Sequence, residues 1–488
     1  VLIMHSLIKE SWYEILVTTI YIINFLAIIN LIFREKRSIE ATVAWVLVLT
    51  TAPAIGCILY IAVGRGISKN NMFKIKEAED KILKENIIDT QIKLDRNDNF
   101  EPNLIGYKDM IYALANSNNS HFTTNNDVEI FPEPNDFFES LLEELKKAKH
   151  HINIQFYIFK DDEIGNKIID ILIDKAQNGV EVRLLYDAVG SRLFSDKSIH
   201  KLKKSGVKVG AFFPSFMKVI NFNLNYRNHR KIVVIDGNVG FIGGNNIGDE
   251  YLGKDPKFGY WRDTHLKITG DSVKDLNIRF ILDWRYTTKE DLVLDKYFGN
   301  ETLRLSNSKA CKDIGIQIVS SGPDSTELDE IKYGYIKMIQ KAKKYIYIQT
   351  PYFILDKTLT DTLKIACFSG VDVRIMIPSK PDHPFVYWAS SSYAGELLKY
   401  GAKLYNYDHN AFLHAKTIVV DDCVCSIGTA NMDIRSFELN FEINAFMYSS
   451  EVAKKQRAIF ENDILKSKEI TLDMYNSRSR YMRLKESI

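Results

Sequence analysis

Residues 226–251 read YRNHRKIVVIDGNVGFIGGNNIGDEY, and residues 411–437 return to the same pattern as AFLHAKTIVVDDCVCSIGTANMDIRSF. Each copy has His-x-Lys, an apolar run rich in β-branched residues and an Asp, followed by Gly and Asn at matching positions. The apolar runs are typical of buried strands. A chain that carries this stretch twice is predicted to be built from two similar halves.

The repeat extends to the residues before each copy. AKHHINIQFYIF (148–159) matches AKKYIYIQTPYFIL (342–355), and helix-like stretches separate such strand-like runs in both parts of the chain. We therefore expect an α/β fold with two pseudo-symmetric halves, residues 128–305 and 306–488, that form one bilobal domain. A site on the pseudo-twofold axis would receive one contribution from each half.

The repeated polar residues predict a site for phosphate chemistry. Residues two apart on a strand point to the same face, so the His and the Lys of each copy project together. An ammonium group attracts an anion, and imidazole serves as a nucleophile or a proton carrier near neutral pH. The motif residues that form the predicted catalytic set are His229, Lys231, Asp236, His414, Lys416 and Asp421.

Two further pairs of motif residues have predicted roles. Asp236 and Asp421 fall in turns, where a carboxylate can accept hydrogen bonds from the backbone, so we expect both to be structural. Asn246 and Asn431 each follow a Gly that allows close backbone approach, and each offers an amide donor to a phosphoryl oxygen. These two asparagines are the predicted phosphate-binding residues.

A carboxylate is also repeated after each copy. Asp263 aligns with Glu442, and either can hold an imidazole N–H and fix the tautomer of the ring. We see no carboxylate cluster suited to a divalent cation, so neither a metal ion nor another cofactor is expected.

Two apolar runs predict a membrane anchor over residues 1–65. Residues 15–33 and 41–63 have no charged side chain, and each run is long enough to form a transmembrane helix. A signal peptide explains the first run less well, because its apolar run is usually shorter and because a second run follows here. More Lys and Arg flank the pair than lie between the runs, which favours a cytoplasmic location for the large domain.

The rest of the composition limits the function classes. Residues 66–127 are polar and are expected to form a linker segment. The chain of 488 residues has 64 Lys and Arg against 62 Asp and Glu, a net charge of +2. No nucleic-acid partner is expected, because such proteins usually carry a strongly basic surface.

The paired HxKxxxxD motifs resemble the phospholipase D superfamily, which has a bilobal α/β fold. With the two apolar runs, GTANMDIRSFELNFEINAF (428–446) and SKEITLDMY (467–475), the resemblance narrows to bacterial cardiolipin synthases and covers nearly the whole chain. It implies a multi-pass enzyme of the bacterial cell membrane that condenses two phosphatidylglycerol molecules to cardiolipin and glycerol through a phosphatidyl-histidine. His229 resembles the nucleophile and His414 the general acid/base, although the symmetry of the motif allows the reverse.

Two alternative functions stay open at this point. A hydrolase of the same superfamily would release phosphatidic acid, and an inactive lipid-binding scaffold would do no chemistry. Phosphatidylglycerol and anionic membrane lipids are the expected partners, and the sequence leaves the oligomeric state open. Aromatic and Met residues near the motifs are either core residues or lipid contacts; the lipid-contact candidates are Phe216, Met217, Phe222 and Trp388.

Overall fold

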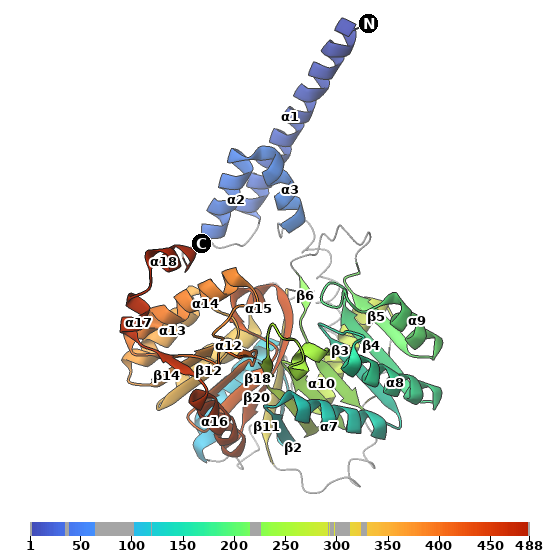
Figure 1. The fold of residues 1–488 in the computed structure, drawn as a ribbon, viewed down its shortest axis with the longest axis vertical. Coiled ribbons are helices and arrows are strands. Elements are labelled where there is room, and N and C mark those ends of the chain that lie inside the picture. The colour runs from blue at the N-terminus through green and yellow to red at the C-terminus, as the bar shows by residue number, and fades with distance from the viewer. Residues whose placement is uncertain are drawn as a thin grey trace. The chain divides into compact units, whose positions relative to one another are not determined.

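The computed structural model describes residues 2–34, 39–63, 102–118, 120–214, 226–290, 292, 297, 313–323 and 329–486. These residues form two units, a helical unit at the N-terminus and a larger α/β unit that contains both motifs (Figure 1).

The helical unit consists of α1 (Leu2–Phe33), α2 (Ile39–Thr51) and α3 (Pro53–Val63). Within the described part of the chain, one helix is long and apolar enough to cross a membrane, and its candidate span is the 22 residues Trp12–Phe33. The expectation of two continuous spans therefore needs correction. The apolar run 41–63 is divided at Ala52, because Pro53 has no N–H to continue the hydrogen bonds of α2 and begins a new helix instead.

A polar side chain on α1 compensates for this break. Pro53 cannot donate to the carbonyl of Leu49, four residues earlier, as a helical residue normally would. The buried amide of Asn24 donates to that carbonyl at 3.1 Å and to the carbonyl of Pro53 at 2.9 Å. The Asn24 side chain thus holds α1 against the α2–α3 break.

The first half of the α/β unit is a seven-stranded sheet with helices on its faces (Figure 1). In spatial order its strands are β2 (Asn126–Phe131), β10 (His265–Gly270), β8 (Val239–Gly243), β7 (Ile232–Ile235), β3 (His151–Phe156), β4 (Glu181–Asp187) and β5 (Lys208–Phe212). Its helices are α7 (Pro134–Lys147), α8 (Glu163–Gln177), α9 (Asp196–Lys204) and α10 (Val273–Thr288).

The second half repeats this arrangement strand for strand. In spatial order, its strands that match the first half are β11 (Gly315–Ser321), β20 (Asn440–Tyr448), β18 (Val424–Gly428), β17 (Thr417–Val420), β12 (Tyr345–Gln349), β14 (Asp372–Ile377) and β15 (Lys403–Asn406). Its helices are α12 (Glu330–Lys341), α13 (Lys357–Phe368), α14 (Pro384–Leu397), α15 (Ile434–Glu438), α16 (Ser450–Leu465), α17 (Leu472–Asn476) and α18 (Arg480–Glu486). The strands β3, β4 and β5 run parallel, as do β12, β14 and β15. The predicted mixed α/β fold with two halves is confirmed.

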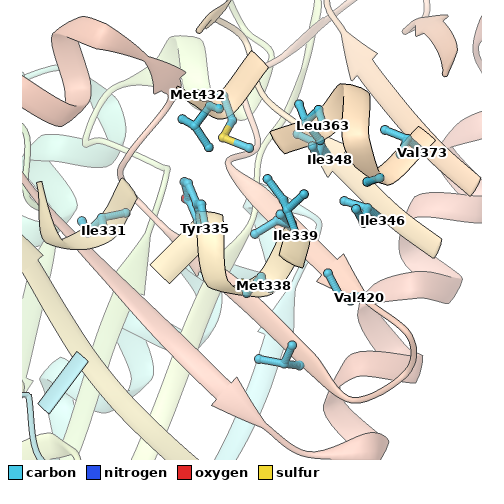
Figure 2. Close-up of a cluster of buried hydrophobic side chains, with 14 of the residues drawn as sticks. Ile331, Tyr335, Met338, Ile339, Ile346, Ile348, Leu363, Val373, Val420 and Met432 are labelled. Atoms are coloured by element: carbon cyan, nitrogen blue, oxygen red, sulfur yellow. The ribbon is translucent and has the colours of Figure 1, made fainter. Parts of the chain in front are cut away.

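Each half has its own hydrophobic core beneath a helix with one apolar face. In the second half, Tyr335 and Ile339 lie on the buried face of α12, and Figure 2 shows Ile339 next to Ile346 and Ile348 of β12. Positions four residues apart lie on one face of a helix, so this spacing directs α12 onto the sheet. The core thereby fixes β12 and the neighbouring β17, which begins directly after the second His-x-Lys.

The expectation of a polar linker over 66–127 needs correction from residue 102 onward; residues 66–101 lie outside the described residues. Residues 102–118 form η2 (Pro102–Tyr107) and α6 (Lys108–Asn118), and β1 (Phe122–Thr123) pairs antiparallel with β11. Met110, Ile111 and Leu114 are buried in the core of the second half. Their helical spacing is hidden among polar neighbours, so this segment resembles a linker in composition although it completes the second half.

A buried polar network supports the first motif. Arg230, between His229 and Lys231, donates from Nη1 to both oxygens of Asp283 on α10 at 2.7 and 2.8 Å. Gln155 of β3 donates to the same carboxylate at 2.9 Å. Because the guanidinium and the carboxylate are both buried, each depends on the other for its polar contacts.

The second half contains a matching network, but its arginine comes from the first half. Gln349, which aligns with Gln155, donates to Asp463 on α16 at 2.8 Å. The arginine paired with Asp463 is Arg262 of the first half, with Nη2 2.8 Å from Oδ2. This buried ion pair joins the two halves next to the second motif.

Candidate active site

Two short strands carry the motif histidines from one half to the other. β6 (Arg227–Asn228) pairs in parallel with β20 of the second half. β16 (Ala411–Leu413) pairs in parallel with β9 (Tyr260–Arg262) of the first half. Each His-x-Lys then spans the extended residues between a crossing strand and a central strand, β7 or β17.

The register of the β6 pairing determines the surroundings of His229. Its backbone N–H donates to the carbonyl of Phe441 at 2.9 Å. Its Nδ1 lies 2.9 Å from Oε2 of Glu442, the next residue of β20. The carboxylate in contact with the first imidazole therefore comes from the second half.

The same arrangement recurs for His414. Its backbone N–H donates to the carbonyl of Arg262 at 2.7 Å, and its Nδ1 lies 2.6 Å from Oδ2 of Asp263. The predicted His-orienting carboxylates do contact the imidazoles, and the contacts are crossed between the halves. In both cases a carboxylate on Nδ1 leaves Nε2 available for chemistry.

Both lysines are buried beside the imidazoles. Lys231 donates from Nζ to the carbonyl of His229 at 2.7 Å, and Lys416 donates to the carbonyl of His414. Burial, opposed by the charge of Glu442, lowers the pKa of Lys231 to about 7. Burial, opposed by the charge of Asp263, lowers the pKa of Lys416 to about 8. An anion bound here would restore both ammonium groups to fuller charge.

Burial favours the neutral form of both imidazoles. Burial, and then the positive charge of Lys416, lowers the pKa of His414 to about 4, against the opposing charge of Asp263. Burial also lowers the pKa of His229, against the charge of Glu442. Lys231 and Lys416 each act on the imidazole of the other half, which shows that the two motifs share one electrostatic environment.

The motif aspartates lie in the tight turns after β7 and β17. Asp236 accepts hydrogen bonds from the backbone N–H groups of residues 149, 150 and 151, and Asp421 accepts them from residues 343, 344 and 345. Both residues adopt positive φ angles, 54° and 53°. In both halves the carboxylate anchors the start of a central strand, and among the described residues no hydrogen bond joins it to His229 or His414.

The predicted phosphate-binding asparagines differ in their contacts. Asn246 accepts from the backbone N–H of Ile158 at 3.1 Å and donates to the hydroxyl of Tyr251 at 2.9 Å, which leaves one amide hydrogen for a ligand. Asn431 is buried, and its Oδ1 has no hydrogen-bond partner among the described residues. The two amides occupy equivalent positions after β8 and β18, but the amide of Asn246 already makes two hydrogen bonds within the first half.

Two aromatic residues beside the imidazoles were not predicted from the sequence. The ring of Tyr157 lies 5.0 Å from that of His229, and the ring of Trp261 lies 5.1 Å from that of His414. Both belong to the first half. The position of Trp261 two residues before Asp263 is the one signal that could have identified it, since alternate residues of a strand share a face.

The remaining predicted positions lie away from these contacts or outside the described residues. Phe216, Met217 and Phe222 fall in residues 215–225, outside the described part of the chain. Trp388 lies on α14 with its ring 5.3 Å from that of Phe385 and 4.9 Å from Nζ of Lys485. Among the described residues, no group of three His, Cys, Asp or Glu side chains could hold a metal ion.

Two His-x-Lys motifs in similar α/β halves, each with its histidine in contact with a carboxylate of the other half, are the arrangement of a phospholipase D-like protein. A family model described as the PLD-like domain of cardiolipin synthase matches residues 141–256 and 335–464. A second model, the N-terminal domain of phospholipase D-nuclease proteins, matches residues 22–65.

Similar proteins show which family of phospholipase D-like proteins the chain belongs to. The chain is 48% identical over 479 residues to the major cardiolipin synthase of Bacillus subtilis (strain 168), covering 97% of this chain and 98% of that one. It is also 48% identical over 473 residues to a cardiolipin synthase of Staphylococcus aureus (strain Mu50), covering 96% and 94% of the two chains. The chain belongs to the bacterial cardiolipin synthases of the phospholipase D superfamily, and it is an enzyme of phospholipid biosynthesis.

A solved structure shares the fold. The phosphatidylserine synthase of Haemophilus influenzae Rd KW20 superposes with a TM-score of 0.59 at 18% sequence identity, covering 77% of this chain and 95% of that one. At this identity the likeness concerns the architecture of the two halves alone.

Proposed function

We propose that the chain condenses two phosphatidylglycerol molecules to cardiolipin and glycerol through a covalent phosphatidyl-histidine. The observation that carries the proposal is the crossed pair of contacts from His229 to Glu442 and from His414 to Asp263, with a buried lysine beside each imidazole. This arrangement supplies a nucleophile, a proton carrier and two positive charges around one phosphodiester.

In the first step, Nε2 of His229 attacks the phosphorus of one lipid and the P–O bond to its headgroup glycerol breaks. His414 gives its proton to the departing glycerol oxygen. The positive charges that lower the pKa of His414 are opposed by the bound phosphodiester anion, which favours the proton on this imidazole before the step. Lys231 and Lys416 neutralise the nonbridging oxygens, with Asn246 and Asn431 as further donors.

In the second step, a glycerol hydroxyl of another phosphatidylglycerol transfers its proton to His414 as its oxygen attacks the phosphorus. The P–N bond to His229 breaks, cardiolipin leaves, and both imidazoles return to their starting states. The roles of the two histidines rest on the family resemblance, and accumulation of phosphatidylated protein in His414→Asn but not in His229→Asn would support them.

The proposal is tested by giving purified full-length protein labelled phosphatidylglycerol in mixed micelles with a nonionic detergent. Cardiolipin and glycerol in equal amounts are expected. Phosphatidic acid as the sole product would indicate that water is the acceptor and that the protein is a hydrolase. Lipid binding without turnover would indicate an inactive scaffold.

The N-terminal unit is proposed to hold the enzyme in the bacterial cell membrane. Trp12–Phe33 has the length of a span, and α2 with α3 would return through the bilayer as a helix kinked at Pro53, a break that membrane helices tolerate when the freed carbonyl is satisfied. The excess of Lys and Arg on the flanks favours a cytoplasmic catalytic domain. A C-terminal alkaline phosphatase fusion should be inactive and a green fluorescent fusion bright; the reverse result would contradict this orientation.

Lipid contacts are proposed for Trp388 and for Phe216, Met217 and Phe222. Support for Trp388 comes from the 66% exposure of its neighbour Phe385, since exposed aromatic side chains are favoured at a bilayer interface. Trp388→Ser should raise the KM for phosphatidylglycerol in micelles severalfold with little change in kcat. An unchanged KM would remove Trp388 from the proposal.

A further inference from the structure

The residues around His229 alternate between two environments. Asn228 and Arg230 point into the first half, where both side chains donate to Asp283. Successive side chains of an extended segment point to opposite sides. The side chains on the other side, which faces the candidate active site, are Arg227, His229 and Lys231.

Arg227 has hydrogen-bonding capacity that the described part of the chain does not use. It is 4% exposed, and within the described residues its Nη1 and Nη2 have no acceptor. Burial lowers the pKa of Arg227, and the negative charge of Asp187 opposes that shift. Asp187 itself accepts from the backbone N–H groups of Val189, Gly190 and Asn228, each at 2.9 to 3.0 Å. A buried guanidinium with unused donors is costly unless an anionic ligand binds to it.

A residue that interacts with the charge of Arg227, Tyr157, lies next to the first imidazole. Tyr157, whose ring lies 5.0 Å from that of His229, is half-buried. Burial and the charge of Asp187 raise the pKa of Tyr157, whereas Arg227 and the exposed Arg435 of α15 act in the opposite direction. Two cationic side chains, one buried and one at the surface, therefore act on the charge of Tyr157.

The second half has no equivalent cation. The residue that aligns with Arg227 is Phe412, which is fully buried with its ring 4.9 Å from that of Trp261. The repeat is otherwise matched at His, Lys, Asp and Asn, so this difference separates the two sides of the site. An asymmetric cation suits a reaction in which two molecules of the same lipid take different roles, one as donor and one as acceptor.

The reaction proposed above involves two phosphodiesters, of which one reacts. Lys231 and Lys416 serve the reacting phosphodiester, while the acceptor lipid brings a second one that stays intact. We propose that Arg227, assisted by the charge of Arg435, binds the phosphodiester of the acceptor phosphatidylglycerol. This inference rests on the proposed function and adds the residues that recognise the second lipid.

The spacing of the strand agrees with this assignment. Side chains two residues apart on a strand are separated by about 7 Å. The two phosphorus atoms of the product are joined by a three-carbon glycerol and two ester oxygens, a flexible bridge of comparable reach. This bridge allows the phosphodiester of the acceptor lipid to lie beside the reacting phosphorus, away from the line between the attacking and the leaving atoms. Arg227 would then favour a lipid acceptor over water or a neutral alcohol.

The test compares two acceptors that use the same covalent intermediate. Cardiolipin formation requires an acceptor with a phosphodiester, whereas exchange of labelled glycerol into phosphatidylglycerol uses an acceptor without one. Both rates are measured on the full chain in mixed micelles of phosphatidylglycerol and a nonionic detergent. Arg227→Gln should lower the ratio of cardiolipin formation to glycerol exchange about tenfold or more, the effect of losing a charge-assisted hydrogen bond.

Further variants keep the test decisive. Arg227→Lys should recover part of the ratio, and Arg435→Gln at the exposed position should lower it by a smaller factor. Arg374→Gln, which removes a distant arginine paired with Asp372, is the matched control and should leave both rates unchanged. An unchanged ratio in Arg227→Gln, with both rates falling together or neither falling, would overturn the inference.

Two other outcomes, a variant that does not fold and a failure of the proposed function itself, give results that differ from these. If Arg227→Gln does not fold, an unchanged ratio in both Arg227→Lys and Arg435→Gln overturns the inference in its place. A wild-type protein that exchanges glycerol but makes no cardiolipin would instead contradict the proposed function.

Discussion

Oε2 of Glu442 lies 2.9 Å from Nδ1 of His229, although the two residues belong to opposite halves of the α/β unit. The second contact of this kind, from His414 to Asp263, crosses in the other direction. The carboxylate partner of each motif histidine therefore lies in the other half. The duplicated sequence gives one composite site at the boundary between the halves.

The crossed carboxylates should control activity more than stability. Glu442→Gln and Asp263→Asn keep the shape of each side chain but remove the charge that fixes and stabilises the imidazole. We expect each variant to lower the rate of cardiolipin formation about a hundredfold or more. Thermal unfolding should change little. A variant with nearly normal turnover would show that its carboxylate is dispensable for the histidine it contacts.

Gly244 provides an independent test of the contact between Asp263 and His414. A Cβ at position 244 would overlap the carboxylate of Asp263, whereas a Cβ at Gly106 would meet no atom within 4 Å. Gly244→Ala should therefore reduce turnover in the same way as Asp263→Asn, because the carboxylate must move. Gly106→Ala serves as the matched control, and equal activities in the two alanine variants would contradict the placement of Asp263.

The motif aspartates should act through stability. Asp421→Ala removes an acceptor from three backbone N–H groups and places Ala at a φ of 53°. We expect the free energy of unfolding to fall by about 2–4 kcal/mol. Asp421→Asn should lose less, because one oxygen remains. Turnover per folded molecule should stay within a few-fold of wild type; normal stability with lost turnover would assign Asp421 a chemical role.

Anion binding should weaken as pH rises through the pKa values of the two lysines. With folded-state pKa values of about 7 and 8, Lys231 and Lys416 are charged at pH 6 and largely neutral at pH 9. Sulfate, a dianion throughout this range, should raise the Tm more at pH 6 than at pH 9. The double variant Lys231→Met, Lys416→Met should lose this pH dependence. A wild-type shift of equal size at both pH values would contradict an anion site at the lysines.

Without a bound anion, the two lysines change the free energy of unfolding with pH in the opposite direction. Because the folded-state pKa values of these lysines lie below the unfolded value, the folded protein binds fewer protons between about pH 7 and pH 10.5. Their contribution to the free energy of unfolding therefore rises with pH when no anion is present. The sulfate comparison separates ligand binding from this background.

The repeat predicted the halves and the motif residues because a duplicated pattern keeps its spacing. It could not predict which carboxylate serves which histidine, since alignment places Asp263 and Glu442 at equivalent positions without relating them to either imidazole. That relation depends on β6 and β16, which have two and three residues and carry no recognisable strand signal. Arg227 was not predicted for a related reason, because its significance lies in a difference between the copies.

The anchor and the linker show two other limits of composition. The run 41–63 is uniformly apolar, but Pro53 divides it, and the compensating Asn24 is distant in sequence. Residues 102–123 appear polar overall, yet Met110, Ile111 and Leu114 lie at helical spacing and are buried. In both segments a few positions decide the structure while the average composition suggests something else.

The pairing of β1 with β11 has a consequence for synthesis on the ribosome. Residues 102–123 emerge before the first half, whereas their partner strand, Gly315–Ser321, is translated after it. At roughly 5–20 residues per second, the apolar face of α6 waits about ten seconds or longer for the surface that covers it. During that interval the nascent chain has to protect this face from aggregation, so chaperone demand should be greatest before the second half leaves the exit tunnel.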